Sequence, residues 1–193
     1  AESLRLPTGV TFREGALVEP LSVGLHAVNT ARLEPGERVM VIGAGPIGLA
    51  VTAWARFFGA RCVIVNERAP GRLALAEKFG ATAVADVSKD DAVSVFTREA
   101  GGPPDVIFEC VGAPGLLQQC IGMVRPRGRV VVVGVCMQMD SIFPVMATIK
   151  EIELRFVVAY RRQDFELTIE MLDRGRIPGR EMVTDIEMAA ALD

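Results

Sequence analysis

Short, continuous apolar runs alternate along this chain with segments in which apolar residues recur at helical spacing. A continuous apolar run is typical of a strand that is buried on both faces, and an apolar residue at every third or fourth position is typical of a helix packed on one side. Gly or Pro marks most of the joins, as at Glu34-Pro35-Gly36-Glu37. The runs predict six strands, at residues 38–42, 61–65, 81–85, 105–109, 129–133 and 152–158.

The helical pattern begins after an irregular opening that extends to about Glu14. The first predicted helix spans 16–31 and has Leu17, Leu21 and Leu25 at helical spacing. We expect the helix at 90–99 to be capped by Asp90 or Ser88. Further helices are predicted at 46–58, 70–79, 114–124 and 164–174, with a weaker helical turn at 143–149.

Strands that alternate with helices in this way predict an α/β fold with a parallel sheet covered on both faces. Right-handed crossovers then favour a doubly wound, six-stranded Rossmann sheet with strand order 3-2-1-4-5-6. In such sheets ligands bind at the carboxyl ends of the strands, near the switch between strands 1 and 4.

Charge and cysteine content exclude several classes of partner. The chain has 21 basic and 24 acidic residues, a net charge of −3, and therefore no electrostatic signature of binding to nucleic acid or an anionic membrane. The uncharged stretch at 39–55 is interrupted by Gly and Pro and is too short to span a membrane comfortably. Four scattered cysteines without a CxxC pair, and no signal peptide at the first residues, predict buried thiols in a cytoplasmic protein.

A glycine motif, Gly43-Ala44-Gly45-Pro46-Ile47-Gly48, lies between the strand at 38–42 and the helix that follows it. Its form is GxGxxG, and this position is the one in which the motif binds a dinucleotide. Gly43 permits a tight turn, Gly45 lets a pyrophosphate approach the backbone, and Gly48 allows close packing of helix on strand. The free N–H groups of the helix N-terminus attract the phosphates. A glycine-rich turn without a ligand is the alternative.

Glu67 ends the second strand, 19 positions after Gly48, where an acidic residue is expected to bind the adenosine ribose. A solvated surface glutamate is the alternative. A carboxylate at 4 Å from the 2′-phosphate of NADP opposes it by on the order of 1 kcal/mol in water and about 4 kcal/mol near a protein surface. Glu67 therefore favours NAD, although the neighbouring Arg68 could receive that phosphate. Arg72, one turn into the next helix, either covers the adenosine or is solvated.

Two further strand ends face the same crevice. Cys110, Val111 and Gly112 follow strand 4, and the run Val133-Gly134-Val135 follows strand 5. Small residues there would let a cofactor lie across the sheet edge, and glycines that simply end strands are the alternative. We expect the backbone at 133–135 to contact the carboxamide of the nicotinamide.

Residues for the chemical step are not evident. His26 is the only histidine, and we expect it to be structural. Tyr160, the only tyrosine, lacks the Tyr-x-x-x-Lys pattern of short-chain reductases. The sequence thus predicts a cofactor domain with no catalytic residue of its own, which also permits a non-catalytic nucleotide-sensing module. A methyltransferase with a similar glycine loop is a poorer alternative, because the loop has the full dinucleotide form.

Several motifs together resemble the zinc-containing medium-chain alcohol dehydrogenase superfamily, in its sorbitol- and threonine-dehydrogenase-like branch. The resemblance covers nearly the whole chain and includes the glycine motif. It is carried further by Glu19-Pro20-Leu21-Ser22-Val23-Gly24-Leu25-His26-Ala27-Val28, Pro35-Gly36-Glu37-Arg38-Val39, Arg72-Leu73-Ala74-Leu75-Ala76-Glu77-Lys78-Phe79-Gly80-Ala81, Phe108-Glu109-Cys110-Val111-Gly112, Gly128-Arg129-Val130-Val131-Val132-Val133-Gly134 and Lys150-Glu151-Ile152-Glu153-Leu154.

The resemblance implies a longer parent protein whose GroES-like catalytic domain, absent from this chain, holds the catalytic zinc. Residues 1–30 would then be a linker and first helix on the side of that domain, and residues 31–193 the NAD(P)-binding Rossmann domain. Glu19 matches a carboxylate that polyol dehydrogenases place near the zinc, and is otherwise a helix-start residue. The resemblance also implies a homodimer through the edge strand at 152–158.

The function expected from this resemblance is oxidation of a secondary alcohol or polyol by NAD in the parent enzyme, with an isolated chain that binds cofactor and catalyses nothing. The rival within the superfamily is the zinc-free quinone or enoyl reductase branch, which is usually linked to NADPH. A basic residue in place of Glu67 would have favoured that branch.

Overall fold

Six parallel strands form one sheet in the computed structural model, which describes residues 3–179 and 182. The strand order is β3-β2-β1-β4-β5-β6, so the predicted doubly wound order 3-2-1-4-5-6 is confirmed. Each strand lies at or within one or two residues of a predicted apolar run. The strands are β1 (Arg38–Ile42), β2 (Cys62–Glu67), β3 (Ala83–Asp86), β4 (Val106–Glu109), β5 (Arg129–Val132) and β6 (Glu153–Phe156).

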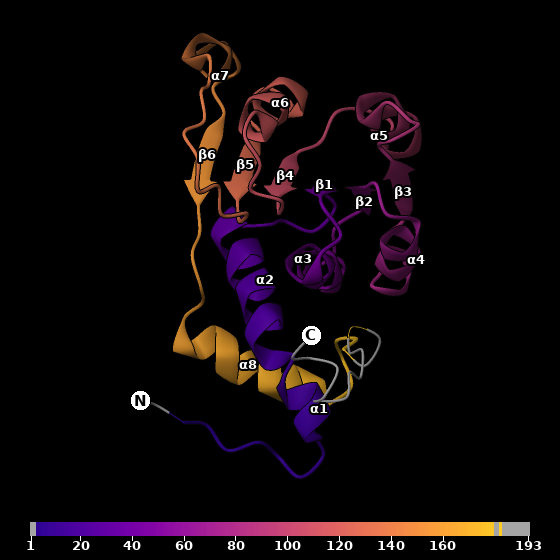
Figure 1. The fold of residues 1–193 in the computed structure, drawn as a ribbon, viewed down its shortest axis with the longest axis vertical. Coiled ribbons are helices and arrows are strands. Elements are labelled where there is room, and N and C mark those ends of the chain that lie inside the picture. The colour runs from indigo at the N-terminus through magenta and orange to yellow at the C-terminus, as the bar shows by residue number, and fades with distance from the viewer. Residues whose placement is uncertain (1–2, 180–181, 183–193) are drawn as a thin grey trace, which may run out of the picture.

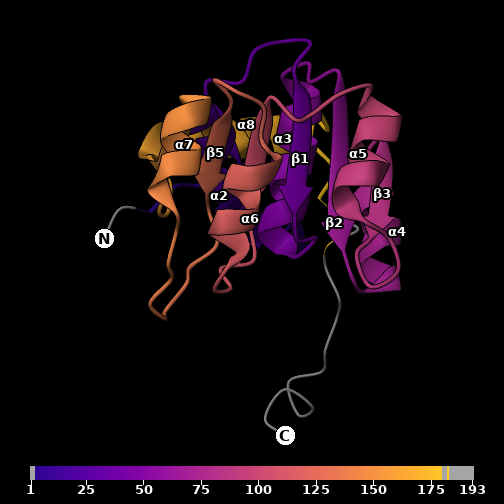
Figure 2. The same cartoon turned by 90° about the horizontal axis from the view of Figure 1, so that it is seen from above.

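Helices cover both faces of the sheet (Figures 1 and 2). Helices α5, α6 and α7 lie on one face, and α2, α3, α4 and α8 lie on the other. No helix among residues 3–179 and 182 is long and apolar enough to cross a membrane. The helices are α1 (Phe12–Gly15), α2 (Val18–Ala31), α3 (Pro46–Phe57), α4 (Pro70–Lys78), α5 (Ala92–Ala100), α6 (Leu116–Met123), α7 (Pro144–Lys150) and α8 (Arg162–Asp173).

Helix boundaries differ from the sequence prediction at three places. The opening is not wholly irregular, because Thr11 and Glu14 form a capping box that starts α1. The cap of α5 is neither Asp90 nor Ser88 but Asp91, whose Oδ2 accepts a hydrogen bond from the Ser94 N–H at 2.8 Å. The weak turn predicted near 143–149 is a regular helix, α7, with Pro144 at its first position.

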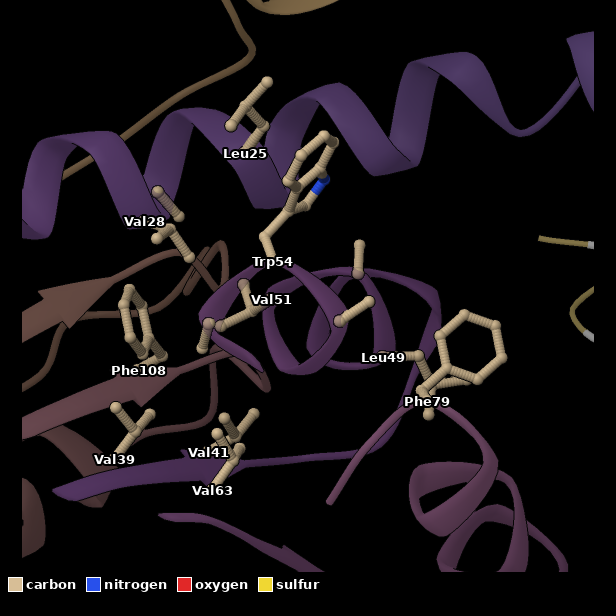
Figure 3. Close-up of a cluster of buried hydrophobic side chains, with 14 of the residues drawn as sticks. Leu25, Val28, Val39, Val41, Leu49, Val51, Trp54, Val63, Phe79 and Phe108 are labelled. Carbon is tan, nitrogen blue, oxygen red and sulfur yellow. The ribbon is translucent and has the colours of Figure 1, made fainter. Parts of the chain in front are cut away.

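Two buried apolar clusters hold the helices on the sheet, one on each face. The larger cluster joins α2 and α3 to the sheet, and Trp54 of α3 lies between these two helices, fully buried (Figure 3). The Trp54 Nε1–H donates to the carbonyl of Leu21 on α2 at 2.8 Å. Gly24 allows this close approach, because a Cβ there would lie 2.6 Å from the Cβ of Ala50. Helix α2 is therefore packed into the core that supports the sheet.

The predicted division at residue 30 stays a prediction, and α2, which packs on α3, spans that position. Residues 180–181 and 183–193 of the predicted Rossmann domain lie outside the described residues.

Asp105, just before β4, binds Arg38 at the amino end of β1 and Arg125 in the loop before β5. Its carboxylate accepts from the Arg38 backbone N–H at 2.8 Å and from the Arg38 Nε at 2.9 Å, and from the Arg125 Nε at 2.5 Å. Burial alone raises the pKa of Asp105, but these hydrogen bonds outweigh it and lower the pKa from 3.8 to about 2. The network therefore favours the ionised carboxylate.

We expect acid to weaken the fold through this group. Because its folded pKa lies below its unfolded value, Asp105 contributes stability that is present above about pH 4 and is lost as the pH falls through about 2. Urea unfolding between these pH values should show the decline, and the Asp105→Asn variant should show a shallower one. Equal slopes for the two proteins would contradict this assignment.

Candidate functional site

The carboxyl edge of the sheet brings three loops together at the switch between β1 and β4. At the carboxyl end of β1, Ile42 is paired in register with Asn66 of β2 on one side and with Glu109 of β4 on the other. The Gly43 N–H donates to the carbonyl of Asn66 at 2.8 Å, and the Cys110 N–H donates to the carbonyl of Ile42 at 2.9 Å. The loops that follow the three strands are thereby held side by side.

The glycine loop after β1 has the local geometry that its sequence predicts. Gly43 has a φ of +94°, in the left-handed region that favours glycine, as a tight turn requires. A Cβ on Gly48 would lie 1.9 Å from the carbonyl oxygen of Gly43, so only glycine permits this packing of α3 on β1. Gly45 faces open space, with no heavy atom within 4 Å of an added Cβ. The N-terminus of α3, with Pro46 at its first position, follows directly.

Glu67, at the end of β2, turns its carboxylate toward the glycine loop. Its Oε2 accepts from the Ala44 N–H at 3.0 Å, and its Oε1 accepts from the N–H groups of Arg68 and Ala69 at 2.6 and 3.1 Å. Burial alone raises the pKa of Glu67, but these three backbone donors outweigh it, so that the pKa is lowered. Glu67 is therefore ionised at neutral pH and set beside the backbone that receives the phosphates in the predicted complex.

Two arginines stand at the mouth of this site. Arg68 follows Glu67 directly and is exposed. The Arg72 Nη1 lies 3.7 Å from the Glu67 Oε2 in an ion pair, with 58% of the Arg72 side chain exposed. Arg72 is therefore neither purely solvated nor held deep in the site.

Glu109 orders the loop after β4. It is buried, and its Oε1 accepts from the N–H groups of Val111 and Gly112 at 2.7 and 2.8 Å. Gly112 has a φ of +73°, and its backbone N lies 2.2 Å from the position of a Cβ built on Gly134. The loops after β4 and β5 therefore touch backbone to backbone, which requires glycine at both positions.

The loops after β1, β2 and β4 border an open cavity of about 890 Å³. Seven of the predicted site residues line it, and they are Gly43, Gly45, Glu67, Arg68, Arg72, Cys110 and Val111. Its other walls come from the loop before α5, from α5 and from α6. Residues that the sequence analysis did not select also line it, among them Ile42, Asn66, Asp91, Val93, Leu116, Gln119 and Met123.

The remaining predicted residues lie next to the cavity rather than in its lining. Pro46, Ile47 and Gly48 form the first turn of α3. Gly112 lies behind Val111, and the run Val133-Gly134-Val135 follows β5, with Val133 buried and Val135 exposed. The missed residue with the clearest sequence signal is Asn66, an amide that ends the apolar run Val63-Ile64-Val65.

The described residues do not fit a zinc ion by themselves. No group of three His, Cys, Asp or Glu side chains among residues 3–179 and 182 could hold a metal. Glu19 is exposed in the first turn of α2, as a helix-start residue would be. The Nδ1 of His26 lies 2.9 Å from the Asp164 Oδ2, so this side chain joins α2 to α8, and its structural role stays a prediction.

A family model described as zinc-binding dehydrogenase matches residues 46–174. The chain belongs to this family. Human sorbitol dehydrogenase is 35% identical to it over 183 residues, a match that covers 93% of this chain and 51% of that protein. Among solved structures, 2R,3R-butanediol dehydrogenase from Bacillus subtilis superposes with a TM-score of 0.85 at 34% identity, covering 94% of this chain and 52% of that one. The resemblance to zinc-containing alcohol dehydrogenases is thus confirmed.

The chain spans about half the length of the relatives it matches. A zinc-binding dehydrogenase from Sinorhizobium meliloti 1021 bound to NADP has a TM-score of 0.86 at 28% identity, over 94% of this chain and 54% of that one. A nicotinamide cofactor and zinc are therefore features of the family, and its relatives act on small alcohols or polyols.

Proposed function

We propose that this chain is the dinucleotide-binding domain of an alcohol or polyol dehydrogenase that transfers hydride between a secondary alcohol and NAD. The observation that carries the proposal is the position of Glu67, an ionised carboxylate hydrogen-bonded to the Ala44 N–H of the glycine loop. In this proposal Glu67 binds the ribose, and the open face of Gly45 receives the pyrophosphate of the same extended ligand.

The pyrophosphate, the adenosine ribose and the nicotinamide each have a proposed partner in the chain. The pyrophosphate lies over Gly43 and Gly45, where the N-terminus of α3 offers N–H groups and a partial positive charge. A carboxylate has about four acceptor positions, so Glu67 keeps capacity for a ribose hydroxyl beside its three backbone donors. The nicotinamide end extends across the loops after β4 and β5, with its carboxamide near the backbone of 133–135.

The same carboxylate supports NAD over NADP. A 2′-phosphate on the ribose would meet the ionised carboxylate of Glu67, and the unfavourable interaction corresponds to roughly a fivefold to several-hundredfold loss of affinity. Arg68 favours the opposite choice, since its exposed guanidinium could pair with the phosphate.

A titration tests the proposal. The purified chain should bind NADH more tightly than NADPH, followed by nicotinamide fluorescence. The Glu67→Gln variant should narrow that preference because it removes the charge, while the Glu77→Gln variant, which removes an exposed carboxylate from α4, should leave it unchanged. Tighter binding of NADPH by the unaltered chain would mean that Arg68 dominates and would favour the zinc-free reductase branch. Binding of neither dinucleotide would reject the proposal.

The chemical step belongs to the whole enzyme in this proposal. Zinc, when bound by the parent, would polarise the alcohol oxygen. We propose that its ligands come from the catalytic domain, with Glu19 near them, and that this chain alone binds cofactor without turnover. The four unpaired cysteines support a cytoplasmic enzyme.

We propose further that the domain forms a homodimer through β6. This strand is at the edge of the sheet, and the nearby Phe156 and Val158 are 68% and 82% exposed. An exposed apolar edge strand of this kind needs covering. Light scattering should give twice the 20.8 kDa of the single chain. The Phe156→Lys variant should be monomeric, and Phe12→Lys, at another exposed aromatic, should stay dimeric. A monomeric mass for the unaltered chain would contradict the proposal.

A further inference from the structure

Asn66 is a buried polar residue whose side chain has no hydrogen-bond partner. It ends β2 one position before Glu67, and only 4% of it is exposed. Its Oδ1 is the only buried side-chain nitrogen or oxygen among residues 3–179 and 182 that lacks a partner. Asn66 also lines the cavity that we assign to the dinucleotide. The unpaired amide and the candidate site therefore coincide.

A buried amide without hydrogen bonds is energetically unfavourable, so the Asn66 amide is expected to have a partner. Leaving such a group unsatisfied destabilises a protein. The residues paired with Asn66 on the adjacent strands are Ile42 of β1 and Ala85 of β3, and neither side chain has a hydrogen-bond donor or acceptor. A ligand in the cavity is therefore the natural partner of the Asn66 side chain.

The chemistry of an adenosine leaves one group for this amide. The donors of adenosine are its two ribose hydroxyls and the exocyclic amino group of the base. The ribose is assigned to Glu67, which points to the glycine loop and not to the Asn66 amide. The amino group remains. An asparagine amide can pair with adenine in a bidentate manner, accepting from N6 and donating to N7.

We propose that Asn66 reads the adenine base of the cofactor through its N6 and N7 atoms, an inference that rests on the dinucleotide-binding function proposed above. No hydrogen bond in the described part of the chain holds the amide, so a turn about χ2 breaks none. Such a turn would bring the oxygen, which is buried in the ligand-free chain, to the base. Asn66 is then a specificity residue for the base, as Glu67 is for the ribose.

Hypoxanthine provides the contrasting base. It carries a carbonyl oxygen at C6 in place of the amino group and keeps N7, so it presents two acceptors where adenine presents a donor and an acceptor. One amide can satisfy only one of them. A bidentate pair of this kind discriminates against the wrong base by roughly 5- to 150-fold.

The test is a titration of the full 193-residue chain with NADH and with reduced nicotinamide hypoxanthine dinucleotide, both followed by nicotinamide fluorescence. We expect NADH to bind at least about fivefold more tightly. The Asn66→Leu variant should bind the two within about twofold of each other, while Gln119→Leu, which removes another amide from the cavity lining, should keep the preference. If leucine does not fit at position 66, the Asn66→Ala variant is titrated in its place.

Thermal unfolding of the ligand-free proteins separates this role from a structural one. If the amide serves the ligand, Asn66→Leu should unfold no earlier than the unaltered chain, because it removes an unsatisfied polar group. Equal affinity of the unaltered chain for both dinucleotides would overturn the proposal, as would a preference that survives in Asn66→Leu and Asn66→Ala or is lost in Gln119→Leu. Binding of neither dinucleotide would instead mark failure of the proposed function itself.

Discussion

Replacing Gly48 by alanine is expected to abolish detectable NADH binding and to lower the free energy of unfolding by about 3 kcal/mol. The Cβ would lie 1.9 Å from the carbonyl oxygen of Gly43, which is backbone and cannot move away as a flexible side chain would. Either α3 moves off β1 or the glycine loop changes its path. Both outcomes displace the N–H groups proposed to bind the pyrophosphate. Urea unfolding and NADH titration measure the two effects.

Gly45→Ala is the matched control, because it adds the same methyl group to the same loop without a clash. Gly45 has a φ of −70°, which alanine adopts readily, and no heavy atom lies within 4 Å of its added Cβ. We expect its free energy of unfolding to change by less than about 1 kcal/mol and its affinity for NADH to fall at least about tenfold. Unchanged NADH binding in Gly45→Ala would show that no phosphate lies over this residue.

Replacing Trp54 by alanine is expected to lower the free energy of unfolding by about 4 kcal/mol. Trp54 is fully buried and points from α3 toward α2, beside Leu25 (Figure 3). Its loss would leave a cavity between two helices that are both needed to cover this face of the sheet. Because α3 carries the proposed phosphate-binding N-terminus, weaker NADH binding should accompany the loss of stability.

Trp54→Phe separates packing from hydrogen bonding at this position. It keeps an aromatic ring but loses the Nε1–H bond to the Leu21 carbonyl, so we expect a smaller loss of about 1–2 kcal/mol. Urea unfolding of both variants gives the comparison. A loss in Trp54→Ala no larger than that in Trp54→Phe would show that the indole adds little packing energy to this interface.

Local sequence features predicted the elements well where one feature decided the outcome. The uninterrupted run Val39-Met40-Val41-Ile42 has no helical periodicity, and β1 has the predicted bounds of Arg38–Ile42. Prediction was weaker at helix starts, where several neighbouring residues could each serve as the N-terminal cap. Ser88, Asp90 and Asp91 can all cap a helix, and the backbone path after β3 selected Asp91.

The site residues were likewise predicted where a local signal identified them and missed where their role depended on neighbouring strands. The glycine spacing and the position of Glu67 were visible in the sequence because Rossmann folds place them a set distance apart along one βαβ unit. Asn66 and Glu109 were not selected, since their environment depends on β1 lying between β2 and β4. The signal that could have found them is a polar residue at the end of an apolar strand, which occurs in both.

The sequence by itself determined the strands and the glycine turn, because each depends on backbone preferences and burial within a short stretch of chain. It also determined the strand order, because crossovers between parallel strands are right-handed. Only the tertiary structure decided that Glu67 turns toward Ala44, that Gly112 meets Gly134, and that the amide of Asn66 is left without a partner in the cavity. These contacts join residues from different strands and loops. The geometry of these contacts depends on which strands are neighbours in the sheet, and no periodicity along the chain encodes it.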